Sequence, residues 1–329
     1  MARKAAGASS AHVAQVAREV LARGNAVDAV VSAVLAAAAD SPSVLLGPLQ
    51  VLIGGAGAGL LAIDGRVRQP GMGMPRPRGV LAENPVPLQA RVGVSALPAA
   101  LAAALASAGR MTLTRAAGRA IEHARALSPE RGAVIELVAR HGAAVLAHDA
   151  IAVELIAMAG RSSGGALTRD DLASVRPAVV SCNLNASGVL FVPWRGSSLA
   201  DASNTNVVAA IDSRGLAAIA CYENALDGVA VETLGLVAPL VAAPVMRGRP
   251  RAPPGEACPA ATPIALRPRR GVIELALGVA LAHQADREMD ALLHAVGETS
   301  VAEALRACRE GSAVAIARKT DTVVVVSSA

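Results

Sequence analysis

The segment 201–222, DASNTNVVAAIDSRGLAAIACY, constrains the fold most strongly, because it contains two apolar runs joined by a tight turn. Residues 206–212 and 216–222 alternate as strands do, and the Asp-Ser-Arg-Gly sequence between them is typical of a hairpin. A polar Asn-Thr-Asn cluster, 204–206, stands at the start of this apolar hairpin. We therefore expect paired strands in the second half of the chain, with polar side chains at their mouth.

Helices come before the strands along the chain. Residues 11–40 are typical of two helices: we expect Gly24 in the left-handed conformation that ends the first, and Asn25 as the cap of the second, whose nearly uniform apolar character predicts burial. Further helices are expected at about 98–108, 114–126, 130–141, 149–159 and after the capping box 168–171, then strands at 178–182, 188–193 and 262–266, helices at 272–285 and 301–310, and strands at 313–318 and 322–328. This order favours stacked sheets with helices outside over a parallel βαβ series.

Composition limits the partners of the chain. Its 329 residues are 53% hydrophobic, which suits a substantial buried core, but only 1% are aromatic, so almost no rings are present on which bases could stack. We therefore expect no nucleic-acid partner, and we interpret the net charge of +5 as scattered, solvated arginines. The uncharged stretch 41–63 is interrupted by glycines and two prolines, so we expect no membrane partner.

The residues that bind metals or form disulfides are sparse and widely spaced. Four cysteines include no C-x-x-C pair, and six histidines lack a ligand spacing such as H-E-x-x-H. We interpret the histidines as helix-surface or cap residues and expect no metal and no cofactor. Unpaired cysteines and a beginning without an apolar signal core predict a cytoplasmic protein.

Four segments, in order along the first 210 residues, carry a resemblance to a known family. They are ARGNAVDAVVSAVLAAAADSPS, GAGAGLLAIDGRVRQP, GRMTLTRAAGRAIEHARAL and GGALTRDDLASVRP. Together they resemble sequence blocks of the gamma-glutamyltranspeptidases, and the Gly-Asn-Ala-Val-Asp-Ala and Asp-Asp-Leu-Ala blocks are the most specific. The resemblance implies an α+β fold, the four-layer αββα sandwich of the N-terminal nucleophile hydrolases, in a shortened and divergent member.

The resemblance also implies that the precursor cuts its own backbone before a threonine. In the family this threonine stands seven residues ahead of the Asp that begins a hairpin turn, and counting back from Asp212 gives Thr205. The bond between Asn204 and Thr205 would then be cut, and the fragments 1–204 and 205–329 would stay associated as one compact domain. From local sequence alone, the alternative is a β-branched residue that simply starts a strand.

The chemistry of such a site requires a hydroxyl with a base attached to the same residue. Thr205 would be the nucleophile, and its freed α-amine, with a pKa near ~8, would take the hydroxyl proton. Attack on an amide would give an oxyanion, held by backbone N–H groups including that of Gly271, and then an acyl-enzyme. The matching substrate-binding positions are Arg66, Asn206, Asn224 and Thr262.

Some of these positions have plainer interpretations. Arg66 suits a substrate carboxylate, because a guanidinium can bind it through two parallel hydrogen bonds, but an exposed turn arginine is the alternative. Asn224 could contact substrate or cap its loop. We interpret Glu223 and Asp227, which also lie near the hairpin, as solvated loop acids rather than as a catalytic pair.

Several recognition positions of the family are not matched. The Asn-Asn-Glu segment that grips the substrate amine falls near 235–241, where nothing polar remains, and a carboxylate-binding Ser-Ser pair falls on Pro259 and Ala260. We therefore expect an amidohydrolase or acyltransferase whose small-molecule amide or peptide substrate is not ordinary glutathione. Two alternatives remain open: a catalytically inactive scaffold of the same fold, and an amide-forming or cyclising biosynthetic enzyme.

Overall fold

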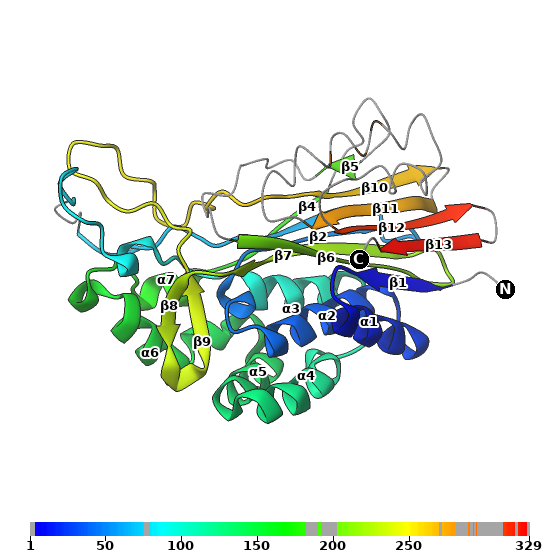
Figure 1. The fold of residues 1–329 in the computed structure, drawn as a ribbon, viewed down its shortest axis with the longest axis horizontal. Helices are drawn as coiled ribbons and strands as arrows, with labels where there is room; N and C mark the ends of the chain where they lie inside the picture. Colours follow the sequence, from blue (N-terminus) through cyan, green and yellow to red (C-terminus); the bar gives the residue numbers. More distant parts are fainter. Residues whose placement is uncertain are drawn as a thin grey trace.

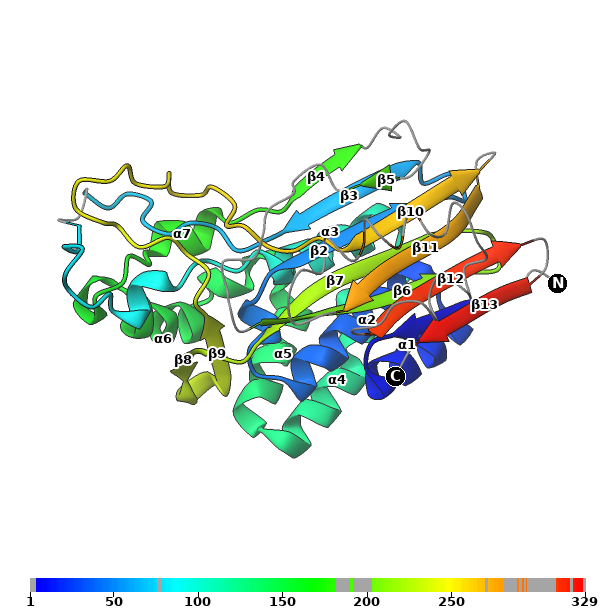
Figure 2. The same ribbon diagram turned by 45° about the horizontal axis from the view of Figure 1, so that its top comes forward.

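Two stacked antiparallel sheets and a layer of helices make up the fold (Figures 1 and 2). The structure is a computed structural model, and it describes residues 4–75, 79–181, 190–191, 203–269, 272–280, 289, 292, 294, 312–319 and 322–327. The helices cover one face of the larger sheet, and the smaller sheet lies over its other face. The expectation of a mixed α+β fold with antiparallel sheets and flanking helices is confirmed.

The larger sheet has the strand order β1-β6-β7-β2-β3-β4, and every neighbouring pair is antiparallel. Its strands are β1 (Ala5–Ala8), β2 (Leu49–Gly54), β3 (Leu60–Gly65), β4 (Ala178–Ser181), β6 (Ser203–Ile211) and β7 (Ala217–Ala225). The predicted hairpin is β6–β7, and it lies between strands that come from the first part of the chain. Asp212 closes its turn, because the carboxylate accepts hydrogen bonds from the backbone N–H groups of Arg214 and Leu216 at 2.8 and 3.1 Å.

The smaller sheet has the order β13-β12-β11-β10-β5. Its strands are β5 (Leu190–Phe191), β10 (Ile264–Arg269), β11 (Val272–Ala280), β12 (Ser312–Lys319) and β13 (Thr322–Ser327), and a separate hairpin joins β8 (Gly228–Val231) to β9 (Leu236–Pro239). The helix expected over 272–285 is wrong for residues 272–280, which form β11. The sequence VIELALGVA is apolar on both faces, so the spacing of its hydrophobic residues does not distinguish a helix from a strand. Its pairing with β10 and β12 determines that it is a strand.

The helical layer matches the sequence closely. The α-helices are α1 (Ala11–Arg23), α2 (Ala26–Asp40), α3 (Leu97–Ala108), α4 (Leu113–Leu127), α5 (Pro129–His141), α6 (Asp149–Ala159) and α7 (Arg169–Ser174). Short 3₁₀ turns occur at Val44–Leu46, Leu88–Arg91, Gly142–Ala147, Arg161–Ser163 and Glu232–Leu234. The helix predicted at 301–310 lies outside the described residues, so a fourth layer over the smaller sheet stays a prediction.

Local capping signals fix several helix ends. Asn25 and Asp28 form a reciprocal capping box at the start of α2, and Thr168 and Asp171 do the same for α7, as expected. Gly24 is different: its φ is −119°, so it is not left-handed. Glycine is needed there for space, because a Cβ would lie 2.6 Å from a carboxylate oxygen of Asp28.

Two apolar cores lie on opposite faces of the larger sheet, and strand alternation decides which residues enter each. Even-numbered residues of β6 and β7, such as Val208, Ala210 and Ala220, pack against the helices, including the buried and mostly apolar helix α2. Odd-numbered residues, such as Val207 and Ile219, pack between the two sheets against β10 and β11. Each residue of the central hairpin is therefore assigned to one layer or the other by its parity alone.

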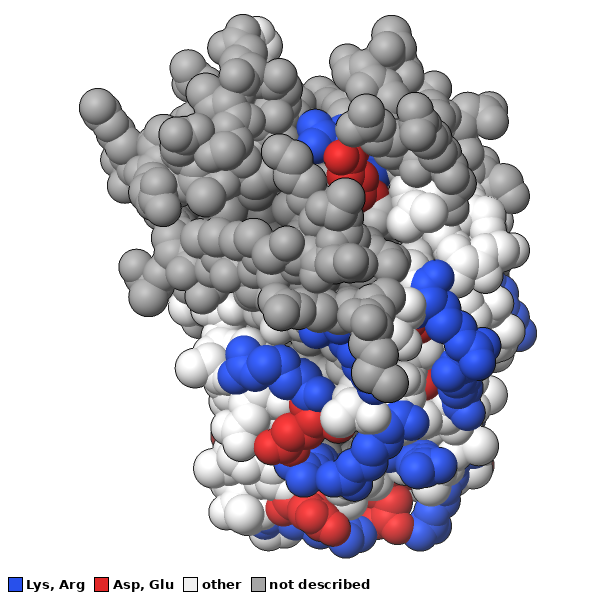
Figure 3. Space-filling view, turned by 90° about the vertical axis from the view of Figure 1, so that its right-hand side faces the viewer, with Lys and Arg blue, Asp and Glu red and all other residues white. Residues whose placement is uncertain are grey.

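The end of the molecule where α1 and β1 lie is mixed in charge (Figure 3). In Figure 3, which faces the end where α1 and β1 lie, Lys and Arg side chains are interspersed with Asp and Glu. Among the described residues, no single helix is long and apolar enough to cross a membrane, although the bent pair Pro129–Ala147 and Asp149–Ser163 reaches that length and composition together.

Candidate active site

Thr205 lies at the beginning of β6, on the face of the larger sheet that is turned toward the smaller sheet. Its parity is that of Val207 and Ala209, which line the core between the sheets. Only 5% of the residue is exposed. Among the described residues, none forms a hydrogen bond with the Thr205 hydroxyl. Thr205 is therefore a buried residue on the face between the two sheets.

Glu223 stands directly opposite Thr205 on β7. Facing residues of an antiparallel pair have Cβ atoms about 4.5–5.5 Å apart, so the carboxylate is within reach of the threonine hydroxyl. Glu223 is 4% exposed, and one of its oxygens accepts a hydrogen bond from the backbone N–H of Ala261 at 3.4 Å. The interpretation of Glu223 as a solvated loop acid is wrong, because β7 extends three residues past the predicted strand end; Asp227 is exposed, as expected.

A buried amide and a thiol continue this polar row. Gln50 on β2 pairs with Cys221 on β7, and both side chains face the smaller sheet. The thiol of Cys221 donates to the amide oxygen of Gln50 at 3.0 Å. The amide nitrogen of Gln50 is buried and has no hydrogen-bond partner within the described part of the chain. A single polar residue in the apolar run 49–54 was the sequence signal that could have marked this position.

Arg66 belongs to a buried charge cluster at the end of β3. Its guanidinium donates two hydrogen bonds to the carboxylate of Asp64, at 2.9 and 3.1 Å, and Arg68 approaches the same carboxylate at 3.2 Å. The side chains of the two arginines are only 12% and 14% exposed, so the interpretation of Arg66 as an exposed turn arginine is wrong. Together the three groups carry one positive charge, because two guanidinium groups share one carboxylate.

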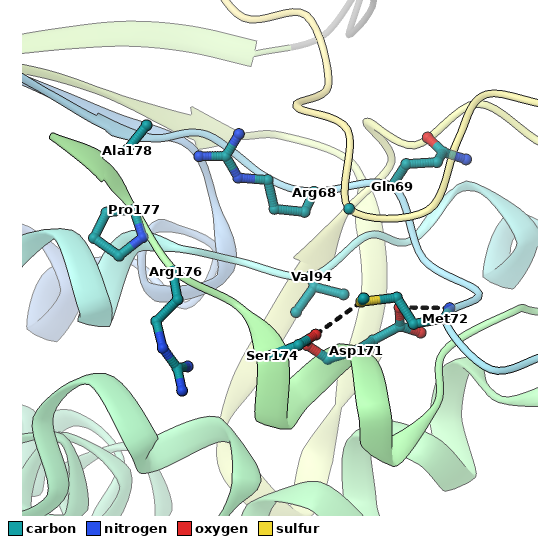
Figure 4. Close-up of a pocket in the computed structure, with 10 residues that line it drawn as sticks. Arg68, Gln69, Met72, Val94, Asp171, Ser174, Arg176, Pro177 and Ala178 are labelled. Atoms are coloured by element: carbon teal, nitrogen blue, oxygen red, sulfur yellow. Dashed lines mark hydrogen bonds between the residues drawn. The ribbon is translucent and has the colours of Figure 1, made fainter. Parts of the chain in front are cut away.

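A cavity of about 300 Å³ adjoins this cluster (Figure 4). Arg68 and Arg176 are among its lining residues, with Met72 and Ser174 on the opposite wall from Arg68. Asp64 pairs with Ala178, another lining residue, so the cavity lies at the same end of the larger sheet as Thr205. Three strand spacings separate β6 from β3, which places the cluster roughly 14 Å from Thr205.

Thr262 lies at the Thr205 end of the smaller sheet, where Ala261 bonds to Glu223. Gly271 lies outside the described residues. The next residues along the chain are described, and Ile273 packs at the opposite end of the larger sheet, where a Cβ on Gly54 would lie 2.9 Å from its side chain. At the Thr205 end, β11 instead offers Gly278, whose absent Cβ would meet Val207 at 2.4 Å.

Asn206 and Asn224 face the helical layer, away from Thr205. The amide oxygen of Asn206 accepts a hydrogen bond from the Ser9 hydroxyl at 3.1 Å. The amide oxygen of Asn224 accepts from the hydroxyls of Ser41 and Ser43 at 2.5 and 2.8 Å. The structure therefore does not bring either side chain together with Thr205, and as substrate-binding residues both stay predictions.

The backbone around the predicted cleavage point is flanked by a strand on one side only. Asn204 pairs with Asn224 of β7. On the other side, the β1 ladder ends where Ala8 pairs with Val208, and among the described residues no strand pairs with 203–205 there. Within the described part of the chain, the segment just before Thr205 therefore pairs with one strand, β7. The predicted assignment of Asn204 and Thr205 as the cleavage site remains untested.

The described cysteines do not offer a competing nucleophile. Cys258 lies near Arg66 and Arg68, whose positive charges favour the thiolate, yet burial dominates and raises the pKa of its thiol to about 12. A thiol that stays protonated at neutral pH reacts poorly. The Cys221 thiol is 1% exposed and donates to Gln50.

No family model and no curated sequence matches the chain. Solved structures do match over nearly the whole length. Cephalosporin acylase from Bacillus halodurans aligns with a TM-score of 0.73 and 14% identity, over 99% of this chain and 94% of that one. LmbA2991T421A aligns with a TM-score of 0.76 and 13% identity, over 99% and 97%, and LmbA2991HD with 0.72 and 14%, over 100% and 97%. The chain therefore shares the fold of these proteins, an α+β sandwich of antiparallel sheets flanked by helices.

Proposed function

We propose that the chain is an amidohydrolase or acyltransferase that uses Thr205 as an N-terminal nucleophile, after cutting its own backbone between Asn204 and Thr205. The observation that carries the proposal is the buried Thr205 hydroxyl opposite Glu223, at the end of the layer between two stacked sheets. The full-length likeness to a protein named a cephalosporin acylase supports an acyl-transfer reaction.

Maturation needs a base other than the α-amine, because in the uncut chain the nitrogen of Thr205 is an amide. We propose that Glu223, which pairs with Thr205 across the β6–β7 hairpin, takes the hydroxyl proton. The oxygen then attacks the carbonyl carbon of Asn204, the carbon–nitrogen bond breaks, and the nitrogen takes the proton, leaving an ester. Water hydrolyses the ester to a carboxylate on Asn204 and a free amine on Thr205.

Turnover would follow the same pattern on an external amide. The free amine of Thr205 takes the hydroxyl proton, the oxygen attacks the substrate carbonyl, and the leaving amine departs with that proton. Water or an acceptor amine then releases the acyl group. Backbone N–H groups would hold the oxyanion, and Gly271, which lies outside the described residues, stays the predicted donor.

The acyl group is proposed to carry an anion. Arg68 and Arg176 both line the 300 Å³ cavity, and a guanidinium binds a carboxylate through charge-assisted hydrogen bonds. The free amide nitrogen of Gln50 adds a donor on the same face of the sheet. The buried charge cluster at the end of β3 lies roughly 14 Å from Thr205. A substrate with its carboxylate at the cluster and its amide at Thr205 must span this distance, shortened by the length to which the arginine side chains extend toward Thr205.

The decisive test is the state of the backbone in purified protein. Intact-mass spectrometry of the wild-type chain should show two fragments that meet between Asn204 and Thr205, whereas Thr205→Ala should stay whole. Thr205→Ser keeps a hydroxyl and should be cut more slowly. A wild-type chain that stays whole on prolonged incubation would instead support the inactive scaffold.

A further inference from the structure

Two histidines and an aspartate from three different helices meet on the outer face of the helical layer. His12 is in α1, Asp40 ends α2 and His123 is in α4. Nδ1 of His12 lies 2.8 Å from one oxygen of Asp40, and Nε2 of His123 lies 2.7 Å from the other. The two imidazole rings are 4.6 Å apart. The cluster was invisible in the sequence, because 111 residues separate its first and last members.

We propose that His12, Asp40 and His123 form a binding site for a divalent transition-metal ion, with Zn²⁺ as the best-fitting ion. Their three ligand atoms lie within 4.8 Å of one another. Zinc takes imidazole nitrogens at about 2.0–2.1 Å and carboxylate oxygens at about 2.0–2.2 Å, so small side-chain rotations would place all three atoms around one ion. Two imidazoles and one carboxylate also form a recurrent protein donor set for zinc and for ferrous iron.

The helix geometry favours a cation at this point. Asp40 occupies the last position of α2, where the carbonyl ends of the helix add negative potential to the carboxylate, and the last turn of α2 contains no basic residue. The nearby Arg119 is paired with Glu19, so its charge is already balanced. The charge of buried Arg131 also acts on Asp40, and a metal ion would add to this neutralisation at the helix end.

The surroundings leave room for a further ligand. A cavity of about 360 Å³ adjoins His12 and His123 and is also lined by Arg119 and Glu122. The three ligand side chains are 34–39% exposed, so an ion can enter from solvent and a water can complete its coordination. Calcium and magnesium are disfavoured, because they prefer all-oxygen sites.

A bound ion would join three helices that are far apart in the chain. α1 and α2 are consecutive, but α4 begins more than seventy residues after Asp40. The ion would therefore add a cross-link to the packing of α4 on α2, and removing the metal with a chelator would remove that cross-link. This inference does not depend on Thr205 or on any catalytic activity.

Isothermal titration calorimetry with ZnCl₂ tests the site, using protein without a polyhistidine tag and freed of metal with EDTA. We expect one saturable Zn²⁺ site per chain, and a loss of affinity of at least ~10-fold in each of His12→Gln, Asp40→Asn and His123→Gln. Calcium should give no binding heat. Replacing Zn²⁺ with Co²⁺ should give visible absorption bands that the Asp40→Asn variant lacks.

His148→Gln is the matched control. Its ring stacks on His141 at the same centroid distance, 4.6 Å, but within the described residues this pair belongs to no three-ligand group. The control should bind Zn²⁺ as the wild type does, and circular dichroism should show that all four variants are folded. The proposal is overturned if the wild type shows no saturable binding, or if folded Asp40→Asn and His123→Gln variants keep full affinity, since zinc would then be bound elsewhere.

Discussion

Gly278 of β11 sets how closely the smaller sheet approaches Thr205, and its replacement by alanine gives a calibrated test of that packing. A Cβ at Gly278 would lie 2.4 Å from one methyl carbon of Val207 and 3.1 Å from the other. Ordinary contacts begin about 1 Å farther out, so the sheets must separate or Val207 must move, at a cost of ~1–3 kcal/mol. Alanine also reduces the conformational freedom of the unfolded chain, which stabilises the folded protein by ~0.4–1 kcal/mol. The net expectation is a loss of about 1–2 kcal/mol.

Urea unfolding followed by circular dichroism measures this loss. Gly118→Ala is the matched control, because Gly118 lies within α4 and a Cβ there meets no atom within 4 Å. It should raise the free energy of unfolding by up to ~1 kcal/mol, in keeping with the helix propensities of the two residues. The reasoning is refuted if Gly278→Ala is neutral or stabilising, since the two sheets would then have room for a methyl group near Thr205.

Three further predictions concern buried polar groups. Tyr222 is the single tyrosine, and burial raises the pKa of its phenol, so the folded chain should show no phenolate absorbance at pH 10 while the guanidinium-unfolded chain does. Because the folded pKa is the higher one, the contribution of Tyr222 to stability is complete below the unfolded value of about 10 and is lost as the pH rises beyond it. Asp28→Ala removes a buried acceptor of three backbone N–H groups, at 25, 110 and 111, and should lower the free energy of unfolding by at least ~3 kcal/mol; a loss below ~1 kcal/mol in urea would contradict this. Glu223→Gln should slow self-cleavage by at least ~10²-fold, followed by electrophoresis against time, and an unchanged rate would exclude Glu223 as the base.

Local signals made the helical layer readable from the sequence. The pairs Asn25 with Asp28 and Thr168 with Asp171 complete hydrogen bonds three residues apart, so sequence alone contains both partners. The hairpin turn at Asp212 is equally local. The strand at residues 272–280 could not be predicted in this way, because it depends on pairing with β10 and β12 rather than on the spacing of its own hydrophobic residues.

The candidate site was only half predictable for the same reason. The alignment that leads to Thr205 uses residues close in sequence. The position of Glu223 opposite Thr205 depends instead on the register of β6 against β7. Strand parity then turns Asn206 and Asn224 toward the helices, which composition could not show. Likewise, the meeting of His12, Asp40 and His123 requires three helices to be packed first.

The position of the β6–β7 hairpin has a consequence for a chain that has been cut. β6 is hydrogen-bonded to β1, and β7 is hydrogen-bonded to β2. The hairpin of a fragment beginning at Thr205 would therefore be paired on both sides with strands of the fragment 1–204. Dissociation of this fragment would break the hydrogen bonds of two strand pairs, β1–β6 and β2–β7, and would expose both apolar cores to water. If the chain is cut, two differently labelled batches that are mixed after the cut should therefore not exchange fragments.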